Sequence, residues 1–152
     1  MPIPDFDDNV LPEGVHDCTV AEVEARFGRF QRTDRRMRLT DKLKQYFEAA
    51  RQSGIVKAVI VDGSYTTAKD DPEDVDLIAV LVDEFDSAQE LRPYQRNVID
   101  KAAVRRDYKF DLFAYREADP GYAQLLAVFT EVPVKHRPLT AKEFKGMARI
   151  RL

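Results

Sequence analysis

Two short apolar segments, both rich in β-branched residues, lie close together near the middle of the chain. Ile55–Val61 and Asp74–Val82 have the composition of buried strands. The residues between them, Gly63–Glu73, are polar and include a glycine and a proline, which predicts a loop. Adjacent parallel strands need a longer crossover connection, usually a helix. The sequence therefore argues against a doubly wound parallel sheet.

The other periodic segments predict helices and further strands around this pair. Thr19-Val20-Ala21-Glu22 and Ser87-Ala88-Gln89-Glu90 have the form of capping boxes, and Asp119 before Pro120 suits a helix start. We expect helices over residues 19–26, 34–52, 87–105 and 119–129, and strands over residues 108–115 and 147–152. This order predicts the α+β class, with a mixed β-sheet flanked by helices. The aromatic residues expected in the core are Tyr94, Phe110, Phe113, Tyr122 and Phe129.

The length of the chain suits one domain with one hydrophobic core. It has 152 residues, of which 44% are hydrophobic and 34% are charged. Residues 1–18 contain three prolines and show little periodicity, which predicts an extended, irregular N-terminal arm. Residues 19–152 are then expected to form the single folded domain.

Composition and charge argue against several classes of protein. The formal net charge is −3 and the pI is near 5.5, whereas proteins that grip long nucleic acids usually carry a basic excess. The single cysteine cannot form an intrachain disulfide, and the two histidines lie far apart, which argues against a structural zinc site. The N-terminus lacks the features of a signal peptide, and no apolar stretch is long enough to span a bilayer. We therefore expect a cytoplasmic protein with no membrane partner.

Asp74 and Asp76 begin the second of the two central strands. Residues two apart in a strand point to the same face, so these carboxylates are expected to lie side by side. They share that face with Ile78, Val80 and Val82, which we expect to be buried. Two carboxylates in such a position cost free energy through desolvation and repulsion, and a bound cation removes much of that cost. Because Mg²⁺ prefers oxygen ligands, the pair is a candidate metal site.

A glycine–serine pair and a third carboxylate extend this pattern. Gly63 and Ser64 directly follow the first strand, where a sharp turn can present backbone N–H groups and a hydroxyl to phosphate oxygens. Asp111 interrupts the apolar sequence Tyr108-Lys109-Phe110-Asp111-Leu112-Phe113, again a costly position without a partner. Three strand-borne carboxylates of this kind can hold two metal ions for in-line displacement at phosphorus.

These residues resemble the signature of the polymerase-beta-like nucleotidyltransferase superfamily. The resemblance rests on Gly63-Ser64, on the ten-residue step to Asp74-Val75-Asp76-Leu77, and on Asp111. It implies a helix-flanked mixed sheet in which Asp74, Asp76 and Asp111 bind two Mg²⁺ ions, with Asp111 also a candidate base for the acceptor hydroxyl. The residues expected to bind the nucleoside triphosphate are Gly63, Ser64, Tyr65 and Lys69.

The resemblance covers roughly residues 57–115, and one stretch within it departs from the signature. Small members of the superfamily commonly carry an arginine and another glycine soon after the glycine–serine pair, whereas this chain has Tyr65-Thr66-Thr67-Ala68-Lys69-Asp70. Lys69 is the candidate replacement as a phosphate contact. Residues 11–16, the Phe27-Gly28 step and residues 145–150 are further similar to a small uncharacterised branch of the same superfamily.

The resemblance implies an enzyme that uses Mg²⁺ and a nucleoside triphosphate such as ATP. It would transfer a nucleoside monophosphate to a hydroxyl group of a protein, an RNA or a small molecule, and release pyrophosphate. The alternative is a non-catalytic or weakly active protein of the same fold, paired with a helical partner protein in a toxin–antitoxin or defence system. A nucleic-acid-binding domain without catalysis has the least support, because the net charge is acidic.

Several of these residues also have simpler interpretations. Asp111 can form an ion pair with Lys109 or a nearby arginine, Ser64 can cap a turn, and Lys69 can be a solvated loop lysine. A dense basic cluster precedes the helix expected over residues 34–52. It is either a docking patch for RNA, a nucleotide or an acidic partner, or simply a charged helix start. The cluster consists of Arg29, Arg32, Arg35, Arg36 and Arg38.

Overall fold

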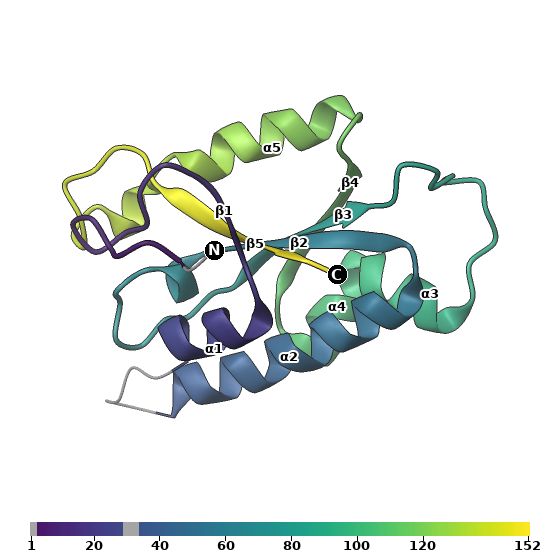
Figure 1. Cartoon of the computed structure of the whole chain (residues 1–152), viewed down its shortest axis with the longest axis horizontal. Coiled ribbons are helices and arrows are strands. Elements are labelled where there is room, and N and C mark those ends of the chain that lie inside the picture. The colour runs from purple at the N-terminus through teal and green to yellow at the C-terminus, as the bar shows by residue number, and fades with distance from the viewer. Residues whose placement is uncertain (1–2, 29–33) are drawn as a thin grey trace.

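The computed structural model describes residues 3–28 and 34–152 (Figure 1). Within these ranges, five strands form one sheet in the spatial order β1-β5-β2-β3-β4. The strands are β1 (Gly14–Cys18), β2 (Val56–Asp62), β3 (Asp76–Leu81), β4 (Asp111–Arg116) and β5 (Gly146–Arg151). Parallel and antiparallel pairs both occur, so the predicted α+β class and mixed sheet are confirmed.

The strand directions follow from the connections between the strands. β2 and β3 are antiparallel and are joined by the predicted loop, which includes a short 3₁₀ turn, η1 (Ser64–Thr66). β3 and β4 are parallel, and their connection contains two helices, as a parallel crossover requires. β5 lies antiparallel to β2 and parallel to β1, so the inner strand of this half comes from the last part of the chain.

Helices cover both faces of the sheet (Figure 1). α1 (Val20–Phe27), α2 (Arg35–Ser53), α3 (Pro93–Ile99) and α4 (Lys101–Tyr108) lie on one face, and α5 (Pro120–Thr130) lies on the other. A second 3₁₀ turn, η2 (Val134–His136), follows α5. None of the described helices combines the length and apolarity that crossing a bilayer requires.

Each face of the sheet has its own cluster of buried side chains, because side chains alternate along a strand. On β3, Leu77 and Ala79 pack toward α1–α4, whereas Ile78 and Val80 pack toward α5. The predicted burial of Ile78 and Val80 is confirmed, and Val82 is half-buried just beyond the strand. The α5 face is the one that carries the carboxylates described below.

The start of α1 confirms its predicted capping box. Thr19 adopts an extended backbone, and its hydroxyl accepts a hydrogen bond from the Glu22 N–H at 3.1 Å. The Glu22 carboxylate accepts one from the Thr19 N–H at 3.3 Å. The chain immediately before this helix differs from the prediction, because residues 14–18 form β1 rather than part of an irregular arm. Their polar sequence hides the strand, whose pairing is supplied entirely by β5.

The helix predicted over residues 87–105 is wrong in its start and its continuity. The first helix, α3, begins at Pro93, and the chain breaks at Asp100 before α4 begins. Proline is well suited to the first position of a helix and poorly suited to its interior, so Pro93 overrides the upstream capping pattern. Asp100 itself caps α4, because its carboxylate accepts a hydrogen bond from the Ala103 N–H at 3.1 Å.

The shifted helix boundaries also change which aromatic residues are buried. Tyr94 is 52% exposed, so its predicted place in the core is wrong. Phe110, Tyr122 and Phe129 are buried as predicted, and Phe113 is half-buried against Phe129. The strand predicted from residue 108 begins at Asp111, because Tyr108 ends α4 and Lys109 then adopts the left-handed conformation (φ 66°).

Candidate functional site

A row of three carboxylates crosses the sheet where β2 ends and where β3 and β4 begin. Asp76 lies opposite Asp62 in the antiparallel pair and opposite Asp111 in the parallel pair. Directly opposed residues project to the same face of a sheet, which here is the face covered by α5. The structure therefore brings Asp76 and Asp111 together from separate parts of the chain, as the sequence predicts.

Asp76 occupies the centre of this row, and the pKa of its carboxylate is strongly raised. Burial raises its pKa, and the charges of Asp74, Asp62 and Asp111 raise it further, to about 6. No hydrogen bond or ion pair joins its carboxylate to any residue that the structure describes. A half-buried carboxylate among like charges is the local condition that a cation or a proton relieves.

Asp74 lies just before β3 and is held by two neighbours. Its Oδ1 accepts hydrogen bonds from the hydroxyl and from the backbone N–H of Ser64, the latter at 3.2 Å. Its Oδ2 lies 2.9 Å from the ammonium nitrogen of Lys135. Burial raises the pKa of Asp74, but the hydrogen bonds from Ser64 and Lys135 outweigh this, and the pKa lies below its ordinary value.

The glycine–serine bend fixes the position of Asp74 through the chain's own backbone. Gly63 has φ 91°, and a Cβ atom added there would lie 2.7 Å from the carbonyl oxygen of Asp74. The sequence suggests that a ligand approaches the backbone closely at Gly63, but in the structure the backbone of Asp74 fills that space. The Ser64 side chain is buried, and its Oγ accepts hydrogen bonds from the N–H groups of Glu73 and Asp74 at 3.1 and 3.2 Å. Ser64 therefore organises the loop that carries Asp74.

Asp111 begins β4 at the outer end of the row. Its side chain is 42% exposed, and its Oδ1 lies 2.9 Å from Nη1 of Arg105, which is 63% exposed. An ion pair with a nearby arginine is the simpler interpretation that the sequence leaves open, and the structure contains it. The pair lies at the surface, so it does not bury Asp111 or close off its other oxygen.

Asp62 is a member of the row that sequence reasoning missed. Its carboxylate accepts a hydrogen bond from the ammonium group of Lys145, which also donates to the carbonyl oxygen of Phe129 at 2.8 Å. Side-chain exposure is 2% for Lys145 and 6% for Asp62. Burial raises the pKa of Asp62, and the adjoining ammonium group opposes the rise. The apolar run that ends at Asp62 gives no local sign of a partner 83 residues away.

Two other residues predicted to bind the triphosphate lie away from the carboxylates. The Tyr65 side chain is fully buried, and its hydroxyl is 2.6 Å from the Thr40 hydroxyl, so it packs in the core on the α1–α4 side. Lys69 is 40% exposed, and its ammonium nitrogen is 4.0 Å from the Glu73 carboxylate. Neither residue lines the pocket described next.

A pocket of about 320 Å³ opens beside Asp74 and Asp76. It is also lined by the end of α5 and the segment that follows it, and by Asp62 and Gly63. Its size is near the lower limit for small-molecule sites, which is about 300 Å³. Three basic side chains from residues 135–145 line it, and none of them was among the predicted site residues. They are Lys135, Arg137 and Lys145.

His136 also lines this pocket, and on sequence grounds it was considered only in excluding a structural zinc site. It is 5% exposed, and burial lowers the pKa of its imidazole. Its Nδ1 is buried with no hydrogen-bond partner among the residues that the structure describes. A buried donor or acceptor in this condition costs about 1–3 kcal/mol, which a bound polar group offsets.

Comparison with known proteins gives a family match. The model of DUF6932, described as a family of unknown function, matches residues 4–151. The chain belongs to the DUF6932 family. No curated protein and no solved structure matches it significantly. The DUF6932 match includes β1, in agreement with the place of that strand in the sheet.

The description of the DUF6932 family names no activity, so the side chains of this chain are the guide to its chemistry. Among residues 3–28 and 34–152, no group of three or more His, Cys, Asp or Glu side chains is arranged to hold a metal ion. Two carboxylates of the predicted set are each already bound by a basic side chain, Asp74 by Lys135 and Asp111 by Arg105. The metal site remains a prediction for this DUF6932 protein.

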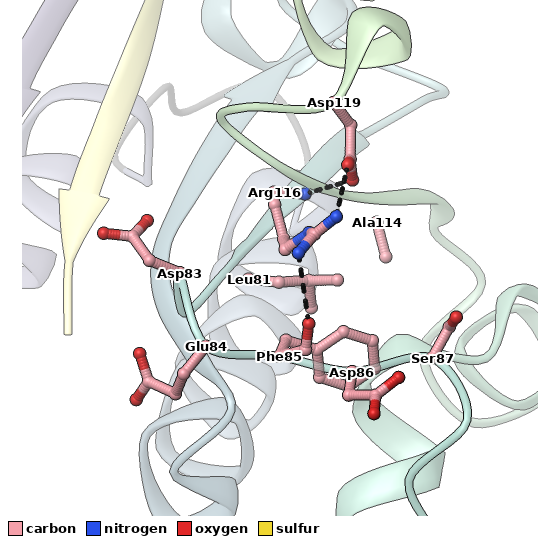
Figure 2. A pocket seen from close by; sticks show the side chains of 9 residues that line it. All are labelled: Leu81, Asp83, Glu84, Phe85, Asp86, Ser87, Ala114, Arg116 and Asp119. Carbon is pink, nitrogen blue, oxygen red and sulfur yellow. Dashed lines mark hydrogen bonds and ion pairs between the residues drawn. The ribbon is translucent and has the colours of Figure 1, made fainter.

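A second pocket, of about 500 Å³, lies beyond the other end of β3 and contains none of the predicted site residues. Figure 2 shows Arg116 at its centre, bonded to Asp119 and to the carbonyl oxygen of Phe85, while Asp83 and Glu84 project away. The guanidinium group of Arg116 in this pocket thus already has hydrogen-bond partners within the chain. Of these two pockets, the one beside Asp76 is the candidate functional site of the DUF6932 chain.

Proposed function

We propose that this protein is a metal-dependent nucleotidyltransferase, which moves a nucleoside monophosphate from a nucleoside triphosphate to a hydroxyl group. The observation that carries the proposal is Asp76, a half-buried carboxylate in register with Asp62 and Asp111. It has no hydrogen-bond partner among the described residues, and its pKa is raised to about 6. A divalent cation relieves such crowding more fully than a proton, because it interacts with several carboxylates at once.

The available donors fit a hard cation. Asp74, Asp76 and Asp111 offer only carboxylate oxygens, which Mg²⁺ prefers. Lys135 and Arg105, which pair with two of them, are each 63% exposed. Surface pairs of this kind contribute about 0–1 kcal/mol, so an incoming cation displaces them at little cost.

Asp62 is excluded from the proposed metal set by the same reasoning. Its partner Lys145 is buried, and removing that ammonium group from a buried carboxylate is expensive. Asp62 and Lys145 therefore hold the end of β2 against the segment after α5. The proposed ligands remain the set that the sequence predicts: Asp74, Asp76 and Asp111.

The chain's own residues have distinct parts in the proposed reaction. Bound Mg²⁺ supplies charge neutralisation and polarises the phosphoryl oxygens. The bend at Gly63 and Ser64 orients Asp74. The Asp111 side chain is more exposed than that of Asp74, and it lies on the edge strand β4, where an acceptor hydroxyl can reach it. It is the candidate base for the proton of that hydroxyl, on a protein, an RNA or a small molecule.

A transfer assay tests this function. Purified protein is incubated with Mg²⁺, each nucleoside triphosphate labelled at the α-phosphate, and cell lysate as the source of acceptors. Label transfer and pyrophosphate release are measured. Asp76→Asn is expected to lower the rate by at least about 100-fold, because several kcal/mol of charge stabilisation are lost. The matched control is Asp83→Asn, an exposed carboxylate beyond the other end of β3, which keeps the wild-type rate. Equal rates for wild type and Asp76→Asn would contradict the proposal.

One observation favours a second candidate, a non-catalytic protein of this fold within a toxin–antitoxin or defence pair. Three of the four carboxylates at the site already have a basic partner, and the Ser64 hydroxyl is used within the loop. The same assay separates the two. Absence of transfer with every nucleoside triphosphate supports the non-catalytic candidate, and transfer that chelation of Mg²⁺ abolishes supports the enzyme.

A further inference from the structure

The segment after α5 brings a lysine from a distant part of the sequence onto Asp74. Lys135 lies in η2, and its ammonium nitrogen is 2.9 Å from Oδ2 of Asp74, 61 residues earlier in the chain. The Lys135 side chain is 63% exposed, whereas that of Asp74 is 22% exposed. Lys135 also lines the pocket of about 320 Å³ that contains Asp76. The ammonium group is therefore at the mouth of the candidate site.

The backbone that carries Lys135 is firmly held, although its side chain is not. Val132 and His136, on either side of it, are both 5% exposed. The Val132 N–H donates to the Glu143 carbonyl oxygen at 2.9 Å, and the Leu139 N–H donates to the His136 carbonyl oxygen at 2.9 Å. An anchored backbone with a flexible, hydrated lysine side chain allows the ammonium group to exchange one oxygen partner for another without moving the fold.

Two other lysines are less suited to hold a phosphate at this site. Lys145 is buried and bound to Asp62. Lys69, the replacement suggested by the sequence, lines neither this pocket nor the one in Figure 2, and it lies near Glu73. Lys135 is the lysine that reaches both the pocket and a proposed metal ligand.

We propose that Lys135 binds the polyphosphate of the nucleotide substrate and shields Asp74 when no substrate is bound. This inference rests on the proposed function and extends it to the recognition of the triphosphate. In the unliganded chain, the ammonium group neutralises Asp74 beside Asp76. When a polyphosphate arrives, the ammonium group turns to the phosphate oxygens, with which it forms charge-assisted hydrogen bonds. Oδ2 of Asp74 is then free for the cation that accompanies the substrate.

The two parts of this proposal predict opposite effects of one substitution. Lys135→Met removes the ammonium group and keeps the length of the side chain. Affinity for inorganic tripolyphosphate in the presence of Mg²⁺, measured by calorimetry, is expected to fall by about tenfold or more. Affinity for Mn²⁺ alone, measured by its electron paramagnetic resonance, is expected to rise by about threefold or more, because Asp74 loses a competing cation.

Three further variants serve as controls for these measurements. Lys135→Arg keeps the charge and is expected to retain tripolyphosphate binding within about threefold of wild type. Lys142 is an exposed lysine in the same segment as Lys135, and it pairs with Asp7. Lys142→Met is expected to change neither the affinity for tripolyphosphate nor the affinity for Mn²⁺. Lys69→Met is likewise expected to leave tripolyphosphate binding unchanged.

The outcomes separate this inference from the proposed function. Wild-type tripolyphosphate affinity in Lys135→Met, weaker Mn²⁺ binding in that variant, or no tripolyphosphate binding by the wild-type protein overturns the inference. Nucleotide transfer that does not depend on Lys135 contradicts the inference but not the proposed function. Binding that depends on Lys135 without any transfer supports the inference and removes the proposed function.

Discussion

The guanidinium group of Arg36 on α2 donates a hydrogen bond to the carbonyl oxygen of Tyr65, at 2.7 Å, in the turn that follows β2. The same side chain donates to the carbonyl oxygens of Phe27, Thr67 and Lys69 at 2.6–3.2 Å. It is fully buried, and burial lowers its pKa to about 10. Arg36 therefore fixes the loop that carries the glycine–serine bend.

The basic cluster before α2 thus has a structural member at its centre. Arg35 pairs with Asp71 at 3.0 Å and Arg38 with Asp34 at 3.1 Å, both at the surface. Arg29 and Arg32 lie outside the described residues. For the described members, the charged helix start is the better interpretation, since each contributes to local structure and Arg36 is inaccessible to a partner.

Replacement of Arg36 is expected to destabilise the fold strongly. Arg36→Met leaves several buried carbonyl groups without their donor, and we expect the free energy of unfolding to fall by at least about 3 kcal/mol. Arg36→Lys is expected to recover little of the loss, because an ammonium group cannot reproduce the planar fork of donors. Urea denaturation measures both, with Arg38→Met as an exposed control that changes stability by less than about 0.5 kcal/mol. A loss below about 1 kcal/mol in Arg36→Met would contradict this role.

The buried pair of Asp62 and Lys145 gives a second stability prediction. Lys145→Met leaves a buried carboxylate without its partner, which typically costs about 3–5 kcal/mol. The double variant Asp62→Leu with Lys145→Met removes both charges and is expected to be more stable than Lys145→Met alone. Thermal and urea unfolding of the two variants give the comparison. A double variant less stable than the single one would show that Asp62 has a further partner.

The raised pKa of Asp76 predicts a stability profile that depends on pH. A carboxyl whose pKa rises from 3.8 to about 6 on folding stabilises the fold below about pH 4 and loses that contribution as the pH rises through 6. Asp76→Asn is therefore expected to be more stable than wild type at pH 7, by on the order of 1–2 kcal/mol after solvent screening. The advantage is expected to disappear near pH 4. Unfolding at a series of pH values, with Asp83→Asn as control, checks both limits.

Gly63 gives a prediction with an internal control. Its φ of 91° disfavours any side chain, and a Cβ atom would meet the Asp74 carbonyl oxygen at 2.7 Å. We expect Gly63→Ala to cost at least about 2 kcal/mol and to weaken metal binding, because Asp74 must move. Gly54 has a similar φ of 71° but open space around it, so Gly54→Ala is expected to cost only about 1 kcal/mol. Calorimetric unfolding distinguishes the two variants. Equal losses of stability would contradict the proposed clash with the Asp74 carbonyl oxygen.

Local signals in the sequence predicted much of the fold and the carboxylate positions. The alternation along residues 74–82 predicted the buried face of β3, and the short polar loop argued against a doubly wound parallel sheet, in agreement with the antiparallel pairing of β2 and β3. Asp111 was grouped with Asp76 because it interrupts an apolar strand and because both residues match the superfamily signature. Arg36 also had a signal, since it occupies the same helical stripe as Thr40, Leu43 and Phe47, all of which are buried. Its charge led instead to a surface interpretation.

The remaining features could not be predicted because they depend on contacts distant in sequence. Lys135 and Lys145 lie in a polar segment, and their partners are 61 and 83 residues away. A lysine in such a segment carries no local mark of its partner. β1 is similarly hidden, since its polar residues are paired by β5 from the other end of the described chain. For residues 87–105, two local signals competed, and Pro93 prevailed over the capping box.

The place of β5 between β1 and β2 has a consequence for synthesis on the ribosome. β5 comes last in chain order among the five described strands, yet β1 is joined to the sheet through it. Until residues 146–151 emerge, β2 keeps an open edge and β1 has no strand to pair with, and open strand edges promote aggregation. A chain that lacks residues 146–151 is therefore expected to aggregate more readily than one that contains them.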